Sequence, residues 1–154
     1  MQFDPATFMQ TVYTEVNDTK VVPCPAGDWQ AQIVELKPKT GTISKGERAG
    51  ETWAGVDVVW EIGDDRVTSI TGRKPTKVRQ NVFLDLNASG SIDFSQGKNI
   101  SLGRLREACD LNRPGQPFNF SQLIGKLAVV EVSHRVDASD ASKLYDEVKS
   151  VRKQ

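Results

Sequence analysis

The chain has 154 residues, equal numbers of basic and acidic side chains (20 each) and a hydrophobic fraction of 38%. This length supports one domain with its own core, and no apolar run approaches the ~20 residues that a membrane-spanning helix needs. The N-terminus lacks the basic and then apolar layout of a signal peptide, so we expect a cytoplasmic protein with no membrane association and with reduced thiols at Cys24 and Cys109.

A short helix near the N-terminus is the first predicted element. Asp4 is a good N-cap, Pro5 suits the first helical position, and apolar residues follow at helical spacing up to Val12. Prolines and a glycine then interrupt regular structure before the first strand. We therefore divide the chain into an N-terminal arm, residues 1–27, and a domain, residues 28–154. The arm could pack on its own domain or on a neighbouring copy, which would make a homo-oligomer.

Hydrophobic alternation predicts five strands, at residues 28–36, 53–62, 77–86, 127–136 and 144–151. The first strand changes phase near Ile33, which predicts a bulge. In the second strand Trp60 falls on the apolar face and Trp53 on the outer face. Residues 37–52 contain almost no apolar side chain and are predicted to form a long mobile loop, and residues 63–75 a turn-rich connection.

One amphipathic helix is predicted between the third and fourth strands, over residues 98–112. Apolar side chains recur on one of its faces, at Leu102, Leu105, Ala108 and Cys109. An Arg-Pro-Gly sequence at residues 113–115 is expected to end it. The order β-β-β-α-β-β predicts a mainly β fold, a five-stranded barrel of the oligonucleotide/oligosaccharide-binding (OB) type.

The charges are unevenly distributed along the chain. Residues 1–65 contain 5 basic and 11 acidic groups, residues 66–106 contain 8 and 2, and residues 107–154 contain 7 of each. A basic centre in an otherwise acidic or neutral protein can attract phosphates locally. The alternative is ordinary surface charge that clusters in the sequence alone.

Aromatic and basic side chains coincide around the second and third strands. The candidate nucleic-acid-binding residues are Trp53, Lys77, Arg79 and Phe83 on the outer faces of these strands, and Arg66, Arg73 and Lys74 between them. Exposed rings that stack on bases, beside cations that follow the phosphates, are typical of single-strand binding, and OB folds use this part of the barrel. The rings could equally pack under a loop, the arm or a partner subunit.

No motif predicts catalysis or a cofactor. Residues 85–96 resemble a calcium-binding loop, but the position that needs a bidentate Glu is Gln96, and a polar turn explains the same residues. His134 is the only histidine, and no nucleophile lies beside a plausible base. We therefore expect a binding protein that is not an enzyme and has no metal or other cofactor.

Several segments together resemble a group of tailed-phage proteins of the single-stranded DNA-binding type. They are FDPATF at residues 3–8, VVWEIGDDRVTSITGR at 58–73, KVRQNVFLDL at 77–86, GKNISLGRLREACDLNRPGQPF at 97–118 and LIGKLAVVEVSHR at 123–135. The resemblance implies an OB barrel that binds single-stranded DNA in phage replication and recombination, beside a recombinase, polymerase or nuclease. Phage proteins of this size and β-content also decorate capsids, which is the alternative function.

Overall fold

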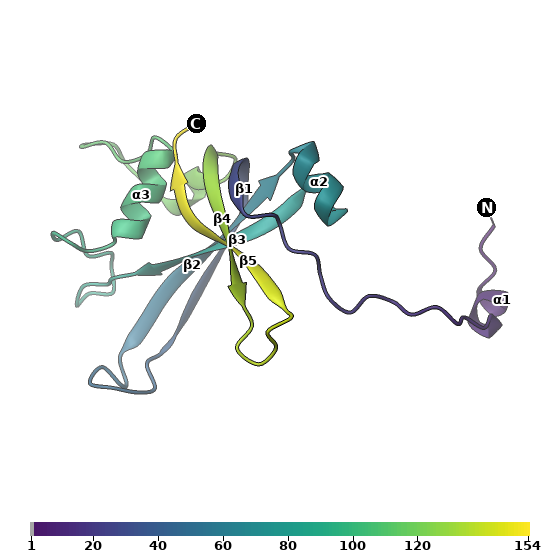
Figure 1. Ribbon diagram of the computed structural model, residues 1–154. Coiled ribbons are helices and arrows are strands. Elements are labelled where there is room, and N and C mark those ends of the chain that lie inside the picture. Colours follow the sequence, from purple (N-terminus) through teal and green to yellow (C-terminus); the bar gives the residue numbers. More distant parts are fainter. Residues whose placement is uncertain (1) are drawn as a thin grey trace.

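The computed structural model describes residues 2–154 and shows a twisted β-sheet with short helices around it (Figure 1). In chain order the elements are α1 (Pro5–Gln10), β1 (Gly27–Thr42), β2 (Thr52–Ile62), α2 (Asp65–Thr71), β3 (Thr76–Leu84), α3 (Ile100–Ala108), the 3₁₀ helix η1 (Phe120–Leu123), β4 (Leu127–Val136) and β5 (Leu144–Arg152). The prediction of a mainly β fold with a helix between the third and fourth strands is confirmed.

The five strands form one antiparallel sheet in the order β3-β2-β1-β4-β5. This order places β3 and β5 at its two edges. The two edge strands approach each other. However, no hydrogen-bonded ladder joins them anywhere in residues 2–154. The predicted closure of the sheet into a barrel is therefore not confirmed, because each edge strand keeps a row of backbone groups without a strand partner.

The core lies on the concave side of this sheet and is filled from all five strands and from α3. Trp60 of β2 is fully buried, as the alternation predicts. Its indole Nε1 donates to Oε1 of Gln80 at 3.0 Å, so this polar side chain on the inner face of β3 has a buried partner. This bond explains why Gln80 breaks the apolar pattern without leaving an unsatisfied donor in the core.

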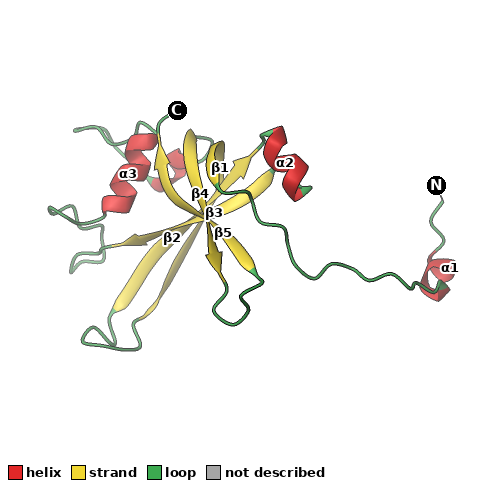
Figure 2. Cartoon of the chain, in the orientation of Figure 1, coloured by secondary structure: helices red, strands yellow, loops and turns green. Residues whose placement is uncertain are grey.

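Strand β1 is longer than predicted, and of the loop predicted over residues 37–52 only residues 43–51 lie outside the strands. β1 continues to Thr42, which pairs with Thr52 of β2, so the two strands make a long hairpin. The register shift between Ile33 and Glu35 confirms the predicted bulge. The outer half of the hairpin projects beyond the helices (Figure 2). It has no core to face, and hydrophobic alternation therefore cannot reveal it.

Helix α2 lies where a turn-rich connection was predicted over residues 63–75, and that prediction is wrong. Asp64 is the N-cap, and its Oδ1 accepts a hydrogen bond of 2.8 Å from the backbone N of Arg66. Gly72 ends the helix at a φ of 72°, a conformation that glycine adopts without strain. Val67 is fully buried and attaches the helix to the core.

Helix α3 is shorter than predicted. The expected apolar face is confirmed, since Leu102, Leu105 and Ala108 are buried. The helix nevertheless ends at Ala108, well before the Arg-Pro-Gly sequence that was expected to stop it. Asp110 has a φ of 60°, so the backbone turns into the left-handed region and cannot continue the helix.

The N-terminal part of the chain projects from the body as an arm (Figure 1). The predicted helix near its end is confirmed as α1, and Asp4 caps it by accepting from the backbone N of Ala6 at 3.2 Å. Residues 11–19 form neither helix nor strand. From here on, "the arm" means residues 2–19.

The arm joins the body beside β5 and β4. Lys20 Nζ donates to Ser142 Oγ, and the backbone N of Cys24 donates to Asp146 Oδ2 at 2.6 Å. His134 Nε2 lies 2.7 Å from the carbonyl oxygen of Cys24, and Cys24 itself is fully buried. The single histidine therefore has a structural partner, and it fixes the position where the chain enters the domain.

Candidate nucleic-acid interface

An aromatic pair lies on the outer face of the hairpin and its neighbour β3. Trp53 of β2 and Phe83 of β3 meet edge to face, with ring centroids 6.0 Å apart and an interplanar angle of 66°. Phe83 is 61% exposed and lies near the end of the edge strand β3. Trp60, seven residues further along the same strand, is buried in the core instead, as the predicted alternation of β2 requires.

Two glycines form the floor beneath these rings. Gly41 pairs with Trp53 across the strands, and a Cβ atom at Gly41 would lie 2.6 Å from the indole Nε1. Gly55 pairs with Phe83, and a Cβ there would lie 3.6 Å from the phenyl ring. Because Gly41 has no side chain, the indole of Trp53 can lie down on the backbone of the neighbouring strand, whereas a Cβ at Gly55 would make only an ordinary contact with the Phe83 ring.

Lys39 of β1 completes this cluster, and the sequence analysis missed it. Its Nζ lies 5.2 Å from the centroid of Phe83, 2.9 Å from Asn81 Oδ1 and 2.6 Å from Asp57 Oδ1. The ammonium group is therefore held beside an exposed ring by a carboxylate and an amide. We call Gly41, Trp53, Gly55, Phe83 and Lys39 the aromatic platform.

Two further predicted residues extend along the same face of β3. Lys77 and Arg79 are exposed and alternate with the buried residues of the strand, as Phe83 does. Lys77 Nζ lies 3.9 Å from Glu61, a loose pair, whereas Arg79 makes no ion pair within the described part of the chain. Arg79 is thus the predicted cation that lies on the same face as the aromatic platform and has no carboxylate partner within residues 2–154 that would compete with a phosphate.

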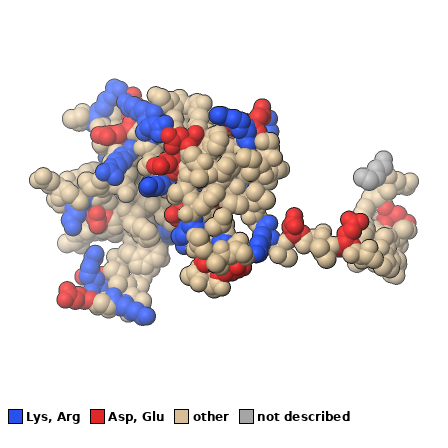
Figure 3. All heavy atoms as spheres, viewed as in Figure 1, with Lys and Arg blue, Asp and Glu red and all other residues tan. Residues whose placement is uncertain are grey.

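Acidic side chains reduce the positive charge of this face. Lys37 lies 3.8 Å from Glu35, and the Lys39 ammonium group has Asp57 as its ion-pair partner. Figure 3 accordingly shows Lys and Arg interspersed with Asp and Glu on the visible side. The basic centre predicted from the sequence is therefore a mixed surface, in which aromatic contacts have to supply much of any binding energy.

The other three predicted residues lie at the opposite end of β2, around α2. The distance from Trp53 to the end of that strand is roughly 30 Å at ~3.3 Å per residue. Arg66 makes two hydrogen bonds to Asp64, at 3.1 and 2.7 Å, and its guanidinium carbon lies 5.1 Å from the ring of Trp29. The structure therefore does not bring Arg66, Arg73 and Lys74 together with the aromatic platform.

The partners of these cations belong to α2 itself. Hydrogen bonds from the Arg66 side chain lower the pKa of Asp64 to about 2. Lys74 Nζ lies 3.2 Å from Asp65, on the first turn of the same helix. Asp64 caps the helix at its positive end, so the carboxylate and the arginine stabilise the local structure of α2.

The loop that resembles a calcium site uses its oxygens for backbone turns. Asn87 Oδ1 accepts from the backbone N of Ser89 and of Ser91, at 3.0 and 3.1 Å. Asp85 Oδ2 accepts from the backbone N of Asn99 at 3.0 Å and so ties the loop to the start of α3. Within residues 2–154, no three His, Cys, Asp or Glu side chains are grouped as a metal site would require.

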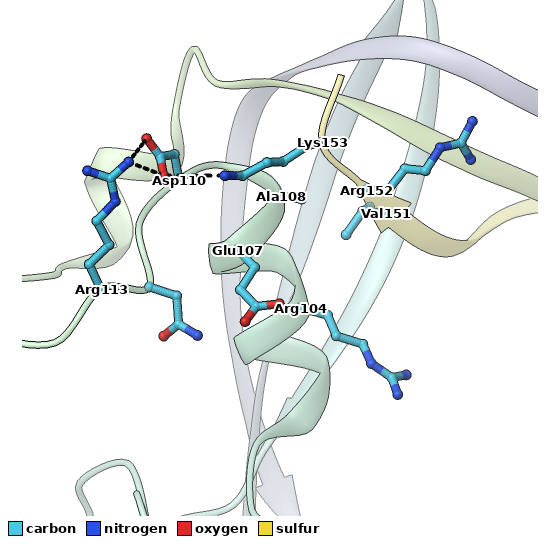
Figure 4. A pocket seen from close by; sticks show the side chains of 9 residues that line it. Arg104, Glu107, Ala108, Asp110, Arg113, Val151, Arg152 and Lys153 are labelled. Carbon is cyan, nitrogen blue, oxygen red and sulfur yellow. Dashed lines mark hydrogen bonds and ion pairs between the residues drawn. The ribbon is translucent and has the colours of Figure 1, made fainter.

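A pocket of about 490 Å³ lies between α3 and the end of β5 (Figure 4). Figure 4 shows Asp110 between Arg113 and Lys153, with both of its oxygens 2.7 Å from the Arg113 guanidinium and one 3.5 Å from Lys153. These hydrogen bonds lower the pKa of Asp110. Arg113 and Lys153 share Asp110 within the pocket, and Arg152 pairs with Asp28 outside it, so most of the cations that line the pocket already have a carboxylate partner.

Both cysteines are buried thiols. Burial raises the pKa of Cys24 to about 12 and that of Cys109 to about 11, so neither is a thiolate near neutral pH. Neither thiol is positioned for nucleophilic chemistry. In residues 2–154, no helix combines the length and the apolar character needed to cross a membrane.

In the comparisons with known proteins, no family model matches the sequence, and no curated protein matches it either.

Proposed function

We propose that the protein binds single-stranded DNA, with little sequence preference, through the aromatic platform and Arg79. The observation that carries this proposal is the Trp53–Phe83 pair, two rings held on a glycine floor at the surface of a rigid sheet. A stack of a base on an aromatic ring contributes ~1–3 kcal/mol and tolerates any base, because every base has a π-face. Bases within a duplex are already stacked on each other, so the platform favours a single strand.

The strand order supports an OB-type fold for this binding. OB folds are partly open five-stranded barrels that bind oligonucleotides on strands 2 and 3 and on the loop between strands 1 and 2. In the present sheet β3 and β5 are the edge strands, and they are the pair that a closed OB barrel would join. The aromatic platform lies on β1, β2 and β3, next to the hairpin tip at residues 43–51.

The cations near the rings suit a phosphate backbone. Lys39 lies beside Phe83, and Arg79 lies four residues from Phe83 along β3. Each phosphate that such a cation neutralises releases counterions, so log affinity should fall against log salt by ~0.7 per contact on single strands. By the resemblance to tailed-phage proteins, the partner processes would be replication and recombination, beside a recombinase, polymerase or nuclease.

The test is a titration with oligo(dT), followed by the fluorescence of the chain's three tryptophans. Trp60 is buried and Trp29 lies under Arg66, so quenching by stacked bases should come from Trp53. We expect quenching that weakens with salt and that is lost in the Trp53→Phe variant. The absence of binding at low salt would reject the proposal.

A capsid-decorating role is the second candidate, and the arm is the observation that favours it. The arm exposes several large apolar side chains, and every one of its residues is exposed. A decoration protein would co-sediment with phage capsids, and its arm would become protected from proteolysis only there. Co-sedimentation together with no oligo(dT) binding would favour this role over the first.

A further inference from the structure

We propose that the arm of one copy docks into a groove beside α3 of a second copy, so that the protein assembles head to tail. The groove lies between α3 and the loop that precedes it. Its lining includes Ile92, Phe94, Lys98, Ile100, Leu102 and Arg104, and we call it the α3 groove. This inference concerns self-association and does not depend on DNA binding.

The arm presents apolar side chains that its own domain does not cover. Val12 is 85% exposed and Val16 94%, and Phe3 packs only against Phe8, with 5.0 Å between the ring centroids. Met9 and Tyr13 are also exposed. An apolar surface of this extent on a projecting segment is typical of a segment that binds a protein.

The α3 groove is an apolar hollow of about 340 Å³. Leu102 is buried in its floor, while Phe94 and Ile100 stand at its rim with exposed fractions of 77% and 51%. A short amphipathic helix that places aromatic and apolar side chains into such a groove is a common form of peptide recognition. Helix α1, with Phe8 and Met9, fits this description.

The charges of the arm and of the α3 groove are also complementary. The arm has three acidic residues, Asp4, Glu15 and Asp18, and no basic residue. In Figure 3 the projecting part of the chain accordingly shows red but no blue beyond its root. At the groove Lys98 and Arg104 make no ion pair within residues 2–154.

Two acidic residues also line the groove, and they do not cancel its positive charge. Asp93 accepts from the backbone N of Ser95 at 2.9 Å and is used within its own loop. Glu107 lies one turn after Arg104 on α3. With Arg106 the groove has three cations against two carboxylates, so an acidic segment is attracted to it.

The arm points away from the α3 groove of its own chain, so the groove that it fills belongs to a second copy. The arm leaves the body beside β5, whereas α3 lies on the other side of the molecule (Figure 1). The root of the arm is fixed by Lys20 and Cys24, so α1 points away from its own groove. Because the arm and the groove are different surfaces, a one-way contact is heterologous and propagates into a ring or a filament, whereas a reciprocal exchange of arms would stop at a closed dimer.

The experiment is sedimentation velocity of the full chain across a concentration series, compared with three single variants. Ile100→Glu damages the groove and Phe8→Glu damages the arm. Ile124→Glu is the matched control, because Ile124 is also 51% exposed but lies outside the groove. We expect the wild type and Ile124→Glu to assemble as the concentration rises, and each of the other two variants alone to remain monomeric.

Mixing the two defective variants tests the head-to-tail geometry. Ile100→Glu keeps an intact arm and Phe8→Glu keeps an intact groove, so an equimolar mixture should form a dimer that cannot grow further. A wild type that stays monomeric at all concentrations would overturn the proposal. So would assembly that persists in either damaged variant, or a mixture that contains only monomers.

Discussion

Trp53 and Phe83 meet edge to face on neighbouring strands, with their ring centroids 6.0 Å apart, above Gly41 and Gly55. An edge-to-face pair is favourable in itself, by ~0.5–1.5 kcal/mol, and it holds each ring in place. The rings therefore do not need to be ordered by a ligand, so less conformational entropy is lost when a base stacks on them.

The glycine floor should matter for binding. In Gly41→Ala the new Cβ would lie 2.6 Å from the Trp53 indole, so the ring has to move off the backbone. We expect oligo(dT) affinity to fall several-fold, while the free energy of unfolding changes by less than ~1 kcal/mol because the ring can swing into solvent. Fluorescence titration and urea unfolding measure the two effects. Gly63→Ala is the control, since no atom lies within 4 Å of that position, and equal affinity in both variants would contradict the role of the floor.

Trp60 should contribute to stability rather than to binding. Trp60→Ala removes a fully buried indole and should lower the free energy of unfolding by ~3–5 kcal/mol. Gln80→Leu leaves the indole N–H without its acceptor and should cost ~1–3 kcal/mol. Phe83→Ala is the exposed control, with a loss below ~1 kcal/mol in urea unfolding. A loss in Phe83→Ala as large as that in Trp60→Ala would show that the outer face is part of the core.

Asp57 should oppose DNA binding through Lys39. Its carboxylate lies 2.6 Å from the Lys39 ammonium group and competes with any phosphate for it. We expect Asp57→Asn to bind oligo(dT) more tightly than the wild type at low salt, and Lys39→Gln to bind less tightly. The salt dependence of log affinity should decrease by ~0.7 in Lys39→Gln. If both substitutions leave the affinity unchanged, Lys39 does not contact the backbone of the strand.

The carboxylate of Asp64 should make the stability of the protein depend on pH in the acid range. Hydrogen bonds from Arg66 lower its pKa to about 2, from an ordinary value of 3.8. A lowered pKa means that the ionised group stabilises the fold above pH ~4, and that this contribution is lost as the pH falls through about 2. We expect the melting temperature of Asp64→Asn to lie below that of the wild type at pH 7 and to meet it near pH 2. A difference that is constant with pH would contradict the ion-pair contribution, because asparagine retains the helix cap.

Much of the sheet could be predicted from the sequence, because its inner face is apolar. The alternation of β2, β3 and β4 identifies Trp60 as a core residue and Trp53 and Phe83 as outer residues. The same signal misses the outer half of β1, which is polar on both faces because it lies beyond the core. Lys39 was missed for this reason, although the alternation of Lys37, Lys39 and Gly41 opposite β2 is regular once the pairing is known.

Only some of the seven predicted nucleic-acid-binding residues lie close together in the structure. The sequence alone does not show how far apart two residues lie along neighbouring strands. Arg66 and Lys74 are near Lys77 in the chain, yet they pair with Asp64 and Asp65 at the start of α2. The signals for α2 were present in the N-cap Asp64 and in Gly72, but only one face of two turns is apolar, and so short a pattern resembles a turn.

The most direct test of the central claim is the titration of dye-labelled oligo(dT) with the full chain, followed by the fluorescence anisotropy of the dye, in the wild type and in Trp53→Ala. We predict salt-dependent binding by the wild type and an affinity lower by roughly 5- to 150-fold in Trp53→Ala, the equivalent of a lost stack of ~1–3 kcal/mol. The urea unfolding midpoint of the two proteins should be similar. Equal affinity in both proteins, or no binding by the wild type at low salt, would contradict the proposal that the aromatic platform binds single-stranded DNA.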